Sequence, residues 1–416
     1  MKSEAETSLY LPTVDGLARI IITMAPLNSS GDIYHIMAYI LLALANNCKV
    51  PDIELTYDIA SKTPDGLPTH STLTTENQAN RSLHFLQAMG LSQYVKAVKV
   101  PYISGRENVR HAQLLKELQR RSNHEKRQIL YIDQMATTTF IAAHVKNEGL
   151  TKTTDIIARG VANRDNEFFP LEMQTKIDAY VTKAISLLTQ ANPSKKPLVV
   201  FHLRYSSHAN KYLNLPDSFV TELVLVLSKC GYQLCFIHAD DRKKIPSYSK
   251  TFPSFTPFHE EGYAKAERDY SKQLHLQLLL GLKNNTTVQA VIGNTSGTLD
   301  LSAFIGLMTY GIHRFITSTI SYQECRLYFQ LCFMTVVALN RKVGAYELGT
   351  PLEDWLNSDR QPKFEINGRT TPRTPKKLLA SSANSGYEKM FSGLFFSPQR
   401  SPKHIELPES KTSLRA

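Results

Sequence analysis

Residues 291–300, VIGNTSGTLD, place an apolar strand, a turn of small hydroxylated residues and the start of a helix in direct succession. Strand–turn–helix units of this kind repeat in α/β folds with a parallel sheet. The first N–H groups of a helix have no partners within the helix, and the helix dipole adds partial positive charge there. The turn is therefore suited to a phosphate or diphosphate. The same residues fit a simple Ser/Thr N-cap equally well.

The same alternation of strands and helices extends over both halves of the chain. Strands are expected at 18–24, 53–57, 95–100, 128–132, 198–203, 233–238, 288–293 and 313–317. The continuous apolar run at 198–203, LVVFHL, is typical of a parallel strand that is buried on both faces. Apolar helices are expected at 33–46 and, at the end of the folded part, at 323–340. We therefore predict an α/β protein with a parallel sheet, covered by helices on both faces, in each half of the chain.

A composition change divides the chain. Residues 191–197, ANPSKKP, form a linker between an N-terminal α/β half at 1–190 and a C-terminal α/β half at 198–357. Residues 358–416 hold six prolines and 11 Lys/Arg against 5 Asp/Glu. This composition predicts a basic, Pro/Ser-rich disordered tail.

Charge and cysteine usage limit the class of protein. The 416 residues carry a formal net charge of +11, which favours anionic partners, but more than half of the excess lies in the predicted tail. Nucleic-acid binding is therefore disfavoured. The five cysteines form no C-x-x-C pair, so we expect neither a disulfide framework nor a zinc site, and we expect a reducing, cytoplasmic compartment. We expect no membrane span and no secretory signal.

Two further groups of residues carry candidate chemistry. Arg204 follows the strand at 198–203, where open α/β sheets bind ligands, and its guanidinium can bind a phosphate in bidentate fashion. His238 and Asp240 end the neighbouring strand and are suited to a ribose or base, or to a plain turn. Gly31 and Asp32 open the first apolar helix; Asp32 is the first candidate for an acceptor-activating base, or a first-turn acid that complements the helix dipole.

Together these features resemble the GT-B glycosyltransferases, in which two Rossmann-like halves face each other and the C-terminal half holds most of the nucleotide-sugar. The resemblance implies two Rossmann-like domains that face a cleft: an acceptor domain at 1–190 and a nucleotide-sugar domain at 198–357. His202-Leu203-Arg204 is similar to the H-x-R motif of the fucosyltransferase branch, which implies that Arg204 faces the donor diphosphate. Residues 291–306 resemble the late motif whose Ser/Thr turn cradles the phosphates. The resemblance implies catalytic roles for Asp32, His35 and Arg204, and donor binding by Gly31, His202, Arg204, His238, Asp240, Asn294, Thr295, Ser296, Thr298 and Asp300.

The resemblance also bears on the cofactor and the substrates. Ser206-Ser207-His208 stands where many fucosyltransferases have an acid, so fucose is one option among donor sugars. The chain has no D-x-D motif, which favours transfer without a metal or other cofactor, from a GDP- or UDP-linked donor to an unknown acceptor such as a protein or glycan. Two alternatives remain open: a non-catalytic protein-binding module of this fold, and an effector that is translocated without an N-terminal signal peptide and acts through its tail.

Overall fold

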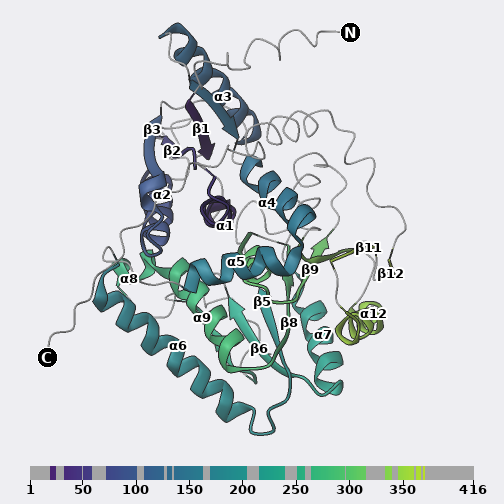
Figure 1. Ribbon diagram of the computed structural model, residues 1–416. Helices are drawn as coiled ribbons and strands as arrows, with labels where there is room; N and C mark the ends of the chain where they lie inside the picture. Colours follow the sequence, from purple (N-terminus) through teal and green to yellow (C-terminus); the bar gives the residue numbers. More distant parts are fainter. Residues whose placement is uncertain are drawn as a thin grey trace, which may run out of the picture.

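The computed structural model describes most of the chain between residues 19 and 370. The described residues are 19–24, 32–48, 50–58, 72–100, 107–125, 129–133, 135–162, 169–203, 215–238, 251–257, 264–295, 297–314, 333–339, 345–359, 362–366 and 369–370. Within them, the chain builds a four-stranded and an eight-stranded sheet, each with helices packed around it (Figure 1). The predicted tail from residue 371 onward and residues 204–214 lie outside this description.

The first sheet is entirely parallel and has the order β3-β2-β1-β4. Its strands are β1 (Arg19–Met24), β2 (Asp52–Asp58), β3 (Val95–Val100) and β4 (Ile129–Asp133). The connecting and following helices are α1 (Asp32–Ala45), α2 (Thr72–Gln87), the short 3-10 helix η2 (Ser92–Tyr94), α3 (Glu107–His124), α4 (Met135–Glu148) and α5 (Leu150–Ala162). Each parallel pair needs such a crossover, which is why strands and helices alternate in the sequence.

The second sheet has the order β12-β11-β10-β9-β8-β5-β6-β7 and is parallel except for its terminal pair β11–β12. The strands are β5 (Leu198–Leu203), β6 (Gln233–His238), β7 (Ser254–Phe255), β8 (Val288–Asn294), β9 (Thr309–Arg314), β10 (Thr335–Leu339), β11 (Phe364–Ile366) and β12 (Arg369–Thr370). The order β7-β6-β5-β8-β9-β10 is that of a doubly wound Rossmann sheet. The predicted fold class, α/β with two Rossmann-like units, is confirmed.

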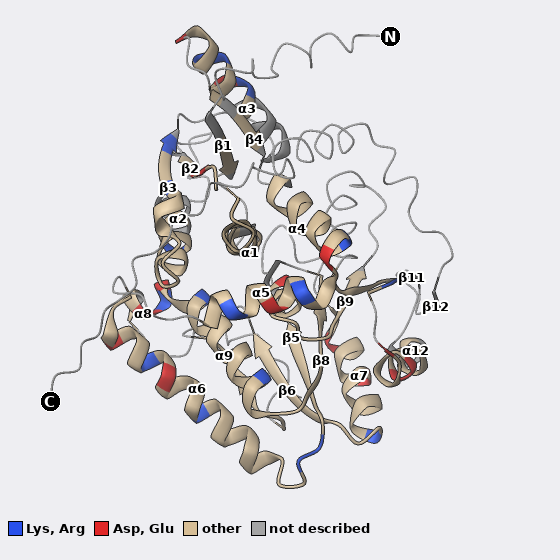
Figure 2. Cartoon of the chain, in the orientation of Figure 1, with Lys and Arg blue, Asp and Glu red and all other residues tan. Residues whose placement is uncertain are grey.

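Helices cover both faces of the second sheet. They are α6 (Leu171–Ala191), α7 (Asp217–Lys229), α8 (Lys265–Asp269), α9 (Ser271–Asn285), α10 (Gly297–Phe304) and α12 (Ala345–Asn357). Val199 and Phe201 of β5 share a core with α7 and with Trp355 of α12, whereas Val200 shares the opposite core with α9 and α10. The central strands β5, β6 and β8 carry no charged residue, as Figure 2 shows. Burial on both faces explains their unbroken apolar sequences.

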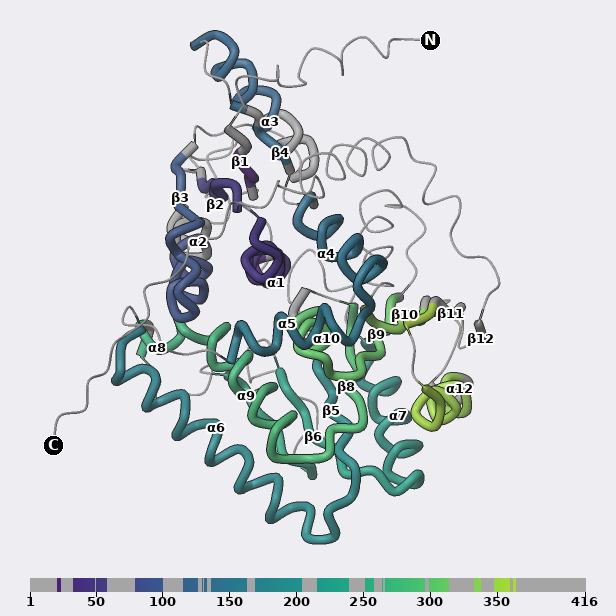
Figure 3. Tube along the Cα trace, in the orientation of Figure 1, coloured from purple at the N-terminus to yellow at the C-terminus, as the bar shows by residue number. Residues whose placement is uncertain are grey.

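Helix α1 lies between the two units, and its residues 33–40 are buried on every side. Ile33, Ile36 and Ile40 have no exposed surface, and one continuous core extends from Ile22 of β1 through α1 to Leu299 of α10. Figure 3 shows α10 below α1, toward the right, and beside α5; α10 contacts both helices. A helix that is apolar on every side is stable only when it is enclosed in this way. The two units are therefore packed together through α1.

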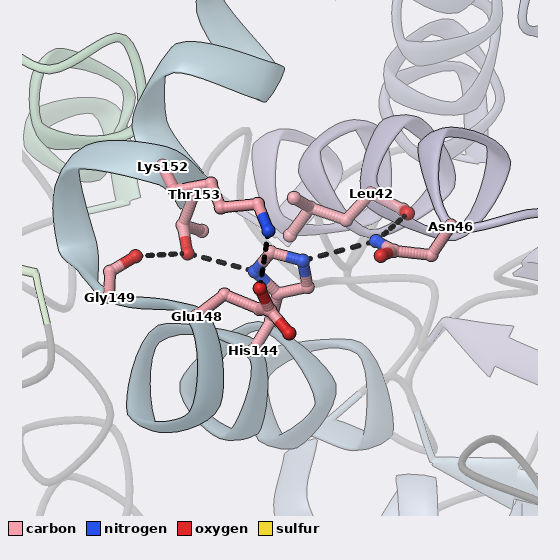
Figure 4. Close-up of polar contacts among 7 residues, drawn as sticks. All are labelled: Leu42, Asn46, His144, Glu148, Gly149, Lys152 and Thr153. Carbon is pink, nitrogen blue, oxygen red and sulfur yellow. Dashed lines mark hydrogen bonds and ion pairs between the residues drawn. The ribbon is translucent and has the colours of Figure 1, made fainter.

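A hydrogen-bonded chain at the end of α1 joins it to α4 and α5 (Figure 4). The Asn46 amide donates to Leu42 O at 2.7 Å and to His144 Nε2 at 3.1 Å. His144 Nδ1–H then donates to Thr153 Oγ1 at 2.8 Å, and that hydroxyl donates to Gly149 O at 2.7 Å. In this series of hydrogen bonds, His144 accepts at Nε2 and donates at Nδ1, so its imidazole carries one proton and is neutral. Burial lowers the pKa of His144, which supports the same form.

Two sequence predictions are wrong. The helix expected at 323–340 contains strand β10, whose buried Thr335, Val336 and Val337 pair with β9. A short apolar run does not distinguish a strand from a buried helix, and this one is rich in β-branched residues. The disordered tail expected at 358–416 begins too early, because β11 and β12 extend the sheet within it.

Two further features bear on the expected organisation. The 191–197 segment connects α6 to β5, and α6, which precedes it, packs along α9 of the second unit; a Cβ on Gly281 of α9 would lie 2.5 Å from Val181 of α6. Among the helices that the structure describes, none combines the length and the apolar character needed to cross a bilayer.

Candidate functional site

The strand orders of the two sheets indicate where a ligand would bind. The order reverses between β1 and β4 in the first sheet and between β5 and β8 in the second. In open α/β sheets, ligands bind beyond the carboxyl ends of the strands at such a reversal. Helices α1 and α4 follow the two strands of the first reversal, and α10 follows β8 of the second. The N-terminal turns of these three helices therefore mark the candidate site.

His35, Thr138 and Asp300 connect the three helices in the first or second turn of each. His35 Nε2 lies 2.8 Å from Asp300 Oδ2, across the junction between the units. The Thr138 hydroxyl lies 3.1 Å from His35 Nδ1. An ionised carboxylate only accepts, so Nε2–H donates to Asp300, and in the neutral imidazole Nδ1 accepts from Thr138. Both ring nitrogens of His35 are thus occupied, and neither is available to an acceptor hydroxyl in this conformation.

This contact is shielded from solvent. His35 is 4% exposed and Asp300 is 0% exposed. The imidazole packs edge-on against Phe304, with ring centroids 4.9 Å apart, and against Phe333, with centroids 6.2 Å apart. A buried carboxylate needs compensation, which His35 and the N-terminal turn of α10 supply. The family resemblance implied donor binding by Asp300; in this conformation its carboxylate instead bonds to His35.

The turn after β8 is held by its two neighbouring strands. A Cβ on Gly293 would lie 2.1 Å from the carbonyl oxygen of His202 on β5, so only glycine fits. Asn294 is 2% exposed. Thr295 Oγ1 lies 2.9 Å from His313 Nδ1 on β9. The Thr295 hydroxyl, predicted to bind phosphate, is therefore already bonded to His313 in this conformation.

Two buried histidines, His202 and His238, lie near the ends of β5 and β6, and a third, His275, lies on α9. His202 Nε2 is 3.0 Å from His275 Nε2 on α9, so one imidazole donates to the other. Burial lowers the pKa of His275 and of His238 to about 4. Burial, followed by the charges of His275 and His238, holds the pKa of His202 well below its ordinary value. All three are neutral near pH 7, and the side chain of His202 is directed at α9.

For several predicted site residues, the structure describes only the backbone or does not describe the residue. Gly31, Arg204, Asp240 and Ser296 lie outside the described residues. Asp32 is the first residue of α1, and Thr298 lies in the first turn of α10. Asp32 precedes His35 by three positions, so the two positions share one side of the helix.

Sequence reasoning did not identify three side chains that contact the predicted residues. Thr138, His275 and His313 bond to His35, His202 and Thr295, respectively. None belongs to a recognisable motif, because each reaches its partner through the tertiary structure. The available signal was a polar residue in an otherwise apolar helix or strand, which predicts a buried hydrogen-bond partner.

Within the described ranges, no group of three or more His, Cys, Asp or Glu side chains is placed to hold a metal ion. The described residues instead show polar side chains that pair between neighbouring elements near the strand ends. The N–H groups at a helix N-terminus are a general means of binding an anion, and three helices begin close together here.

The chain is thus a two-unit α/β protein with two doubly wound sheets, joined where α1, which follows β1, contacts α10, which follows β8. No family model and no curated protein sequence matches it. Among solved structures, it is similar to a glycosyl transferase family 9 protein from Veillonella parvula, with 11% identity, 89% of this chain and 97% of that chain covered, and a TM-score of 0.35.

Two further similar structures are the ADP-heptose LPS heptosyltransferase II of E. coli and the MurG protein of Acinetobacter baumannii. The first has 10% identity, covers 81% of this chain and 98% of that chain, and has a TM-score of 0.35. The second has 10% identity, covers 84% and 96%, and has a TM-score of 0.31. The fold and site described above rest on the strand order and the contacts of this chain itself.

Proposed function

We propose that this protein transfers a sugar from a nucleotide diphosphate donor to an acceptor, at the junction of α1, α4 and α10. The observation that carries this proposal is the meeting of the two sheet reversals, where His35, Thr138 and Asp300 join three helix N-terminal turns. A diphosphate is the ligand that best uses such an arrangement, because helix N-termini and strand-end loops bind anions.

The donor is proposed to lie on the second unit. Arg204 directly follows β5, and residues 294–298 lead from β8 into α10, so both segments leave adjacent strands at the same edge of the sheet. Arg204 and the N–H groups of α10 would neutralise the charge that develops on the leaving diphosphate without a metal. His238 and Asp240, at the end of β6, are proposed to contact the ribose or base. A GDP-linked fucose is one of several sugar nucleotides that this proposal allows as the donor.

The acceptor is proposed to lie against α1. Transfer forms a bond between the acceptor oxygen and C1 of the sugar, while the bond from C1 to the diphosphate oxygen breaks. Asp32 is proposed to take the proton of the acceptor hydroxyl, as the first residue of α1. His35 is proposed as a positioning residue, because its bonds to Asp300 and Thr138 set α1 relative to α10 and α4.

One observation favours a second candidate function, a non-catalytic protein-binding module. His35 and Asp300 satisfy each other across the junction and are almost fully buried. The two units are thereby held together without a ligand, as a module that has lost catalysis would require. Nucleotide binding separates the two functions.

The first experiment is a thermal-shift titration of the full chain with GDP, UDP and ADP in the presence of EDTA. A donor nucleotide at one hundred times its Kd should stabilise the protein by about 2.7 kcal/mol. Arg204→Ala should abolish the shift, whereas Arg120→Ala, on the exposed surface of α3, should preserve it. The absence of any nucleotide-dependent shift would move the assignment to the binding module.

The second experiment measures transfer or hydrolysis of the sugar nucleotide that gives the largest shift. Asp32→Asn should lower the rate by about 10²–10⁴-fold while nucleotide binding is retained. Asp155→Asn, an exposed acid on α5, is the matched control and should leave the rate unchanged. A full rate in Asp32→Asn would exclude Asp32 as the base.

A further inference from the structure

Thr295, the first residue after β8, makes three contacts with the neighbouring strand β9. Its backbone N–H donates to Ile312 O at 3.1 Å, which extends the pairing of the two strands by one residue. Its methyl group lies against Gly311, where an added Cβ would come within 3.0 Å of Thr295 Cγ2. Its hydroxyl lies 2.9 Å from His313 Nδ1. These contacts together fix the rotamer of the Thr295 side chain.

The contact with His313 leaves part of the hydrogen-bonding capacity of Thr295 unused. A threonine hydroxyl has one hydrogen to donate and two lone pairs that accept, and a single bond to an imidazole uses one of these. Thr295 is only partly buried, whereas Asn294 before it is 2% exposed. Thr295 therefore retains both exposed surface and hydrogen-bonding capacity at the point where the chain leaves the strand.

The tautomer of His313 decides whether Thr295 can donate to a ligand. His313 is 8% exposed, and burial lowers its pKa to about 4, so its ring is neutral near pH 7. A neutral imidazole carries one proton, on Nδ1 or on Nε2. If Nδ1 carries no proton, the Thr295 O–H donates to it and the hydroxyl can only accept from a ligand. If Nδ1 carries the proton, it donates to Thr295 Oγ1, and the O–H is available to donate.

A diphosphate requires the second arrangement. The diphosphate of a sugar nucleotide is ionised near pH 7, so its oxygens accept hydrogen bonds and bind donors only. Thr295 leads from β8 toward α10, at the reversal between β5 and β8 where we propose that the donor binds. A hydroxyl that has given its hydrogen to His313 would turn only lone pairs toward a phosphate oxygen, and the two would repel each other.

We infer that His313 is a positioning residue for the sugar donor: its Nδ1–H donates to Thr295 Oγ1 and directs the Thr295 hydroxyl hydrogen toward a phosphate oxygen. This inference rests on the proposed function, because it needs a diphosphate beside the end of β8. His313 acts only through Thr295 and needs no contact with the substrate. The hydroxyl is thereby set to donate before the donor arrives, which lowers the cost of ordering it on binding.

The test is a double-variant cycle on the full chain, with the Kd for GDP, UDP, ADP and inorganic pyrophosphate measured by calorimetry in the presence of EDTA. Thr295→Val keeps the shape of the side chain but removes the hydroxyl, and should weaken the tightest of these ligands about 10–100-fold. His313→Leu should weaken it about three- to tenfold. The double variant should bind as Thr295→Val does, within about twofold, because the imidazole acts only through the hydroxyl.

A rescue variant and a matched control separate positioning from a general loss of structure. His313→Asn places an amide nitrogen close to the position of Nδ1 and should restore the affinity to within about threefold of the wild type. Thr309→Val, on the same strand, removes a buried hydroxyl that donates to Leu307 O at 2.8 Å; it should lower the urea midpoint and leave the affinity unchanged. Unchanged affinity in His313→Leu, additive losses in the double variant or no rescue by asparagine would overturn the inference and leave the proposed function standing. A wild-type protein that binds none of the four ligands would overturn both.

Discussion

Removal of the Asp300 carboxylate tests whether the contact between His35 and Asp300 holds the two units together. Asp300→Ala leaves His35 buried without its acceptor, 2.8 Å from where the carboxylate oxygen was. Loss of a buried hydrogen bond to a charged group costs about 1.5–3 kcal/mol. Asp300→Asn keeps an acceptor oxygen and should cost less, about 1–2 kcal/mol.

The coupling between the two residues separates their interaction from the loss of packing. His35→Ala removes contacts with Phe304 and Phe333 as well as the hydrogen bond. If the bond forms as described, the double variant should be less destabilised than the sum of the single variants by about 2 kcal/mol. Simple additivity of the two single variants would refute the reasoning.

The assay is urea unfolding followed by two probes. Trp355, the single tryptophan, is buried in α12 against the second sheet, so its fluorescence reports the second unit. Far-ultraviolet circular dichroism reports both units. The two transitions should coincide in the wild type and separate in Asp300→Ala, because the first unit then loses a contact to α10. Glu117→Ala, at an exposed pair on α3, should leave both transitions unchanged. Coincident, unshifted transitions in Asp300→Ala would contradict the proposed role.

Two further predictions follow from packing and titration. Gly293→Ala should destabilise the protein by about 3 kcal/mol or more, because its Cβ would lie 2.1 Å from the His202 carbonyl oxygen; Gly149→Ala, at a φ of +87° in open space, should cost only about 1–2 kcal/mol in the same thermal melts. His275 and His238 have pKa values of about 4 in the folded protein against an ordinary 6.5, so the unfolded chain binds protons first as the pH falls. Stability should therefore be complete above pH 6.5 and should fall by about 2 kcal/mol for each histidine at pH 5, as measured by urea midpoints across this range; His275→Phe should flatten that dependence. A midpoint that is constant from pH 7 to 5 would show that these rings are not held neutral.

The amino-acid sequence by itself determined the fold class. Alternating strands and helices predict parallel sheets, and the unbroken apolar run of β5 predicts a strand covered on both faces. The apolar sequence of α1 likewise predicts an enclosed helix. These predictions succeed because burial and periodicity are local properties of the chain. They fail at β10, because a short apolar run is compatible with either a helix or a strand. The run forms a strand because it pairs with β9.

The partners at the site were decided by the tertiary structure alone. The family resemblance made His35 and Asp300 separate candidates, but their pairing joins residues 265 positions apart. Thr138 and His275 carried no motif at all. Such contacts arise only when the sheet orders bring β1 and β4 together, bring β5 and β8 together, and the buried α1 docks on α10. Sequence patterns record which face of an element is buried, whereas the identity of the partner depends on how whole elements pack against each other.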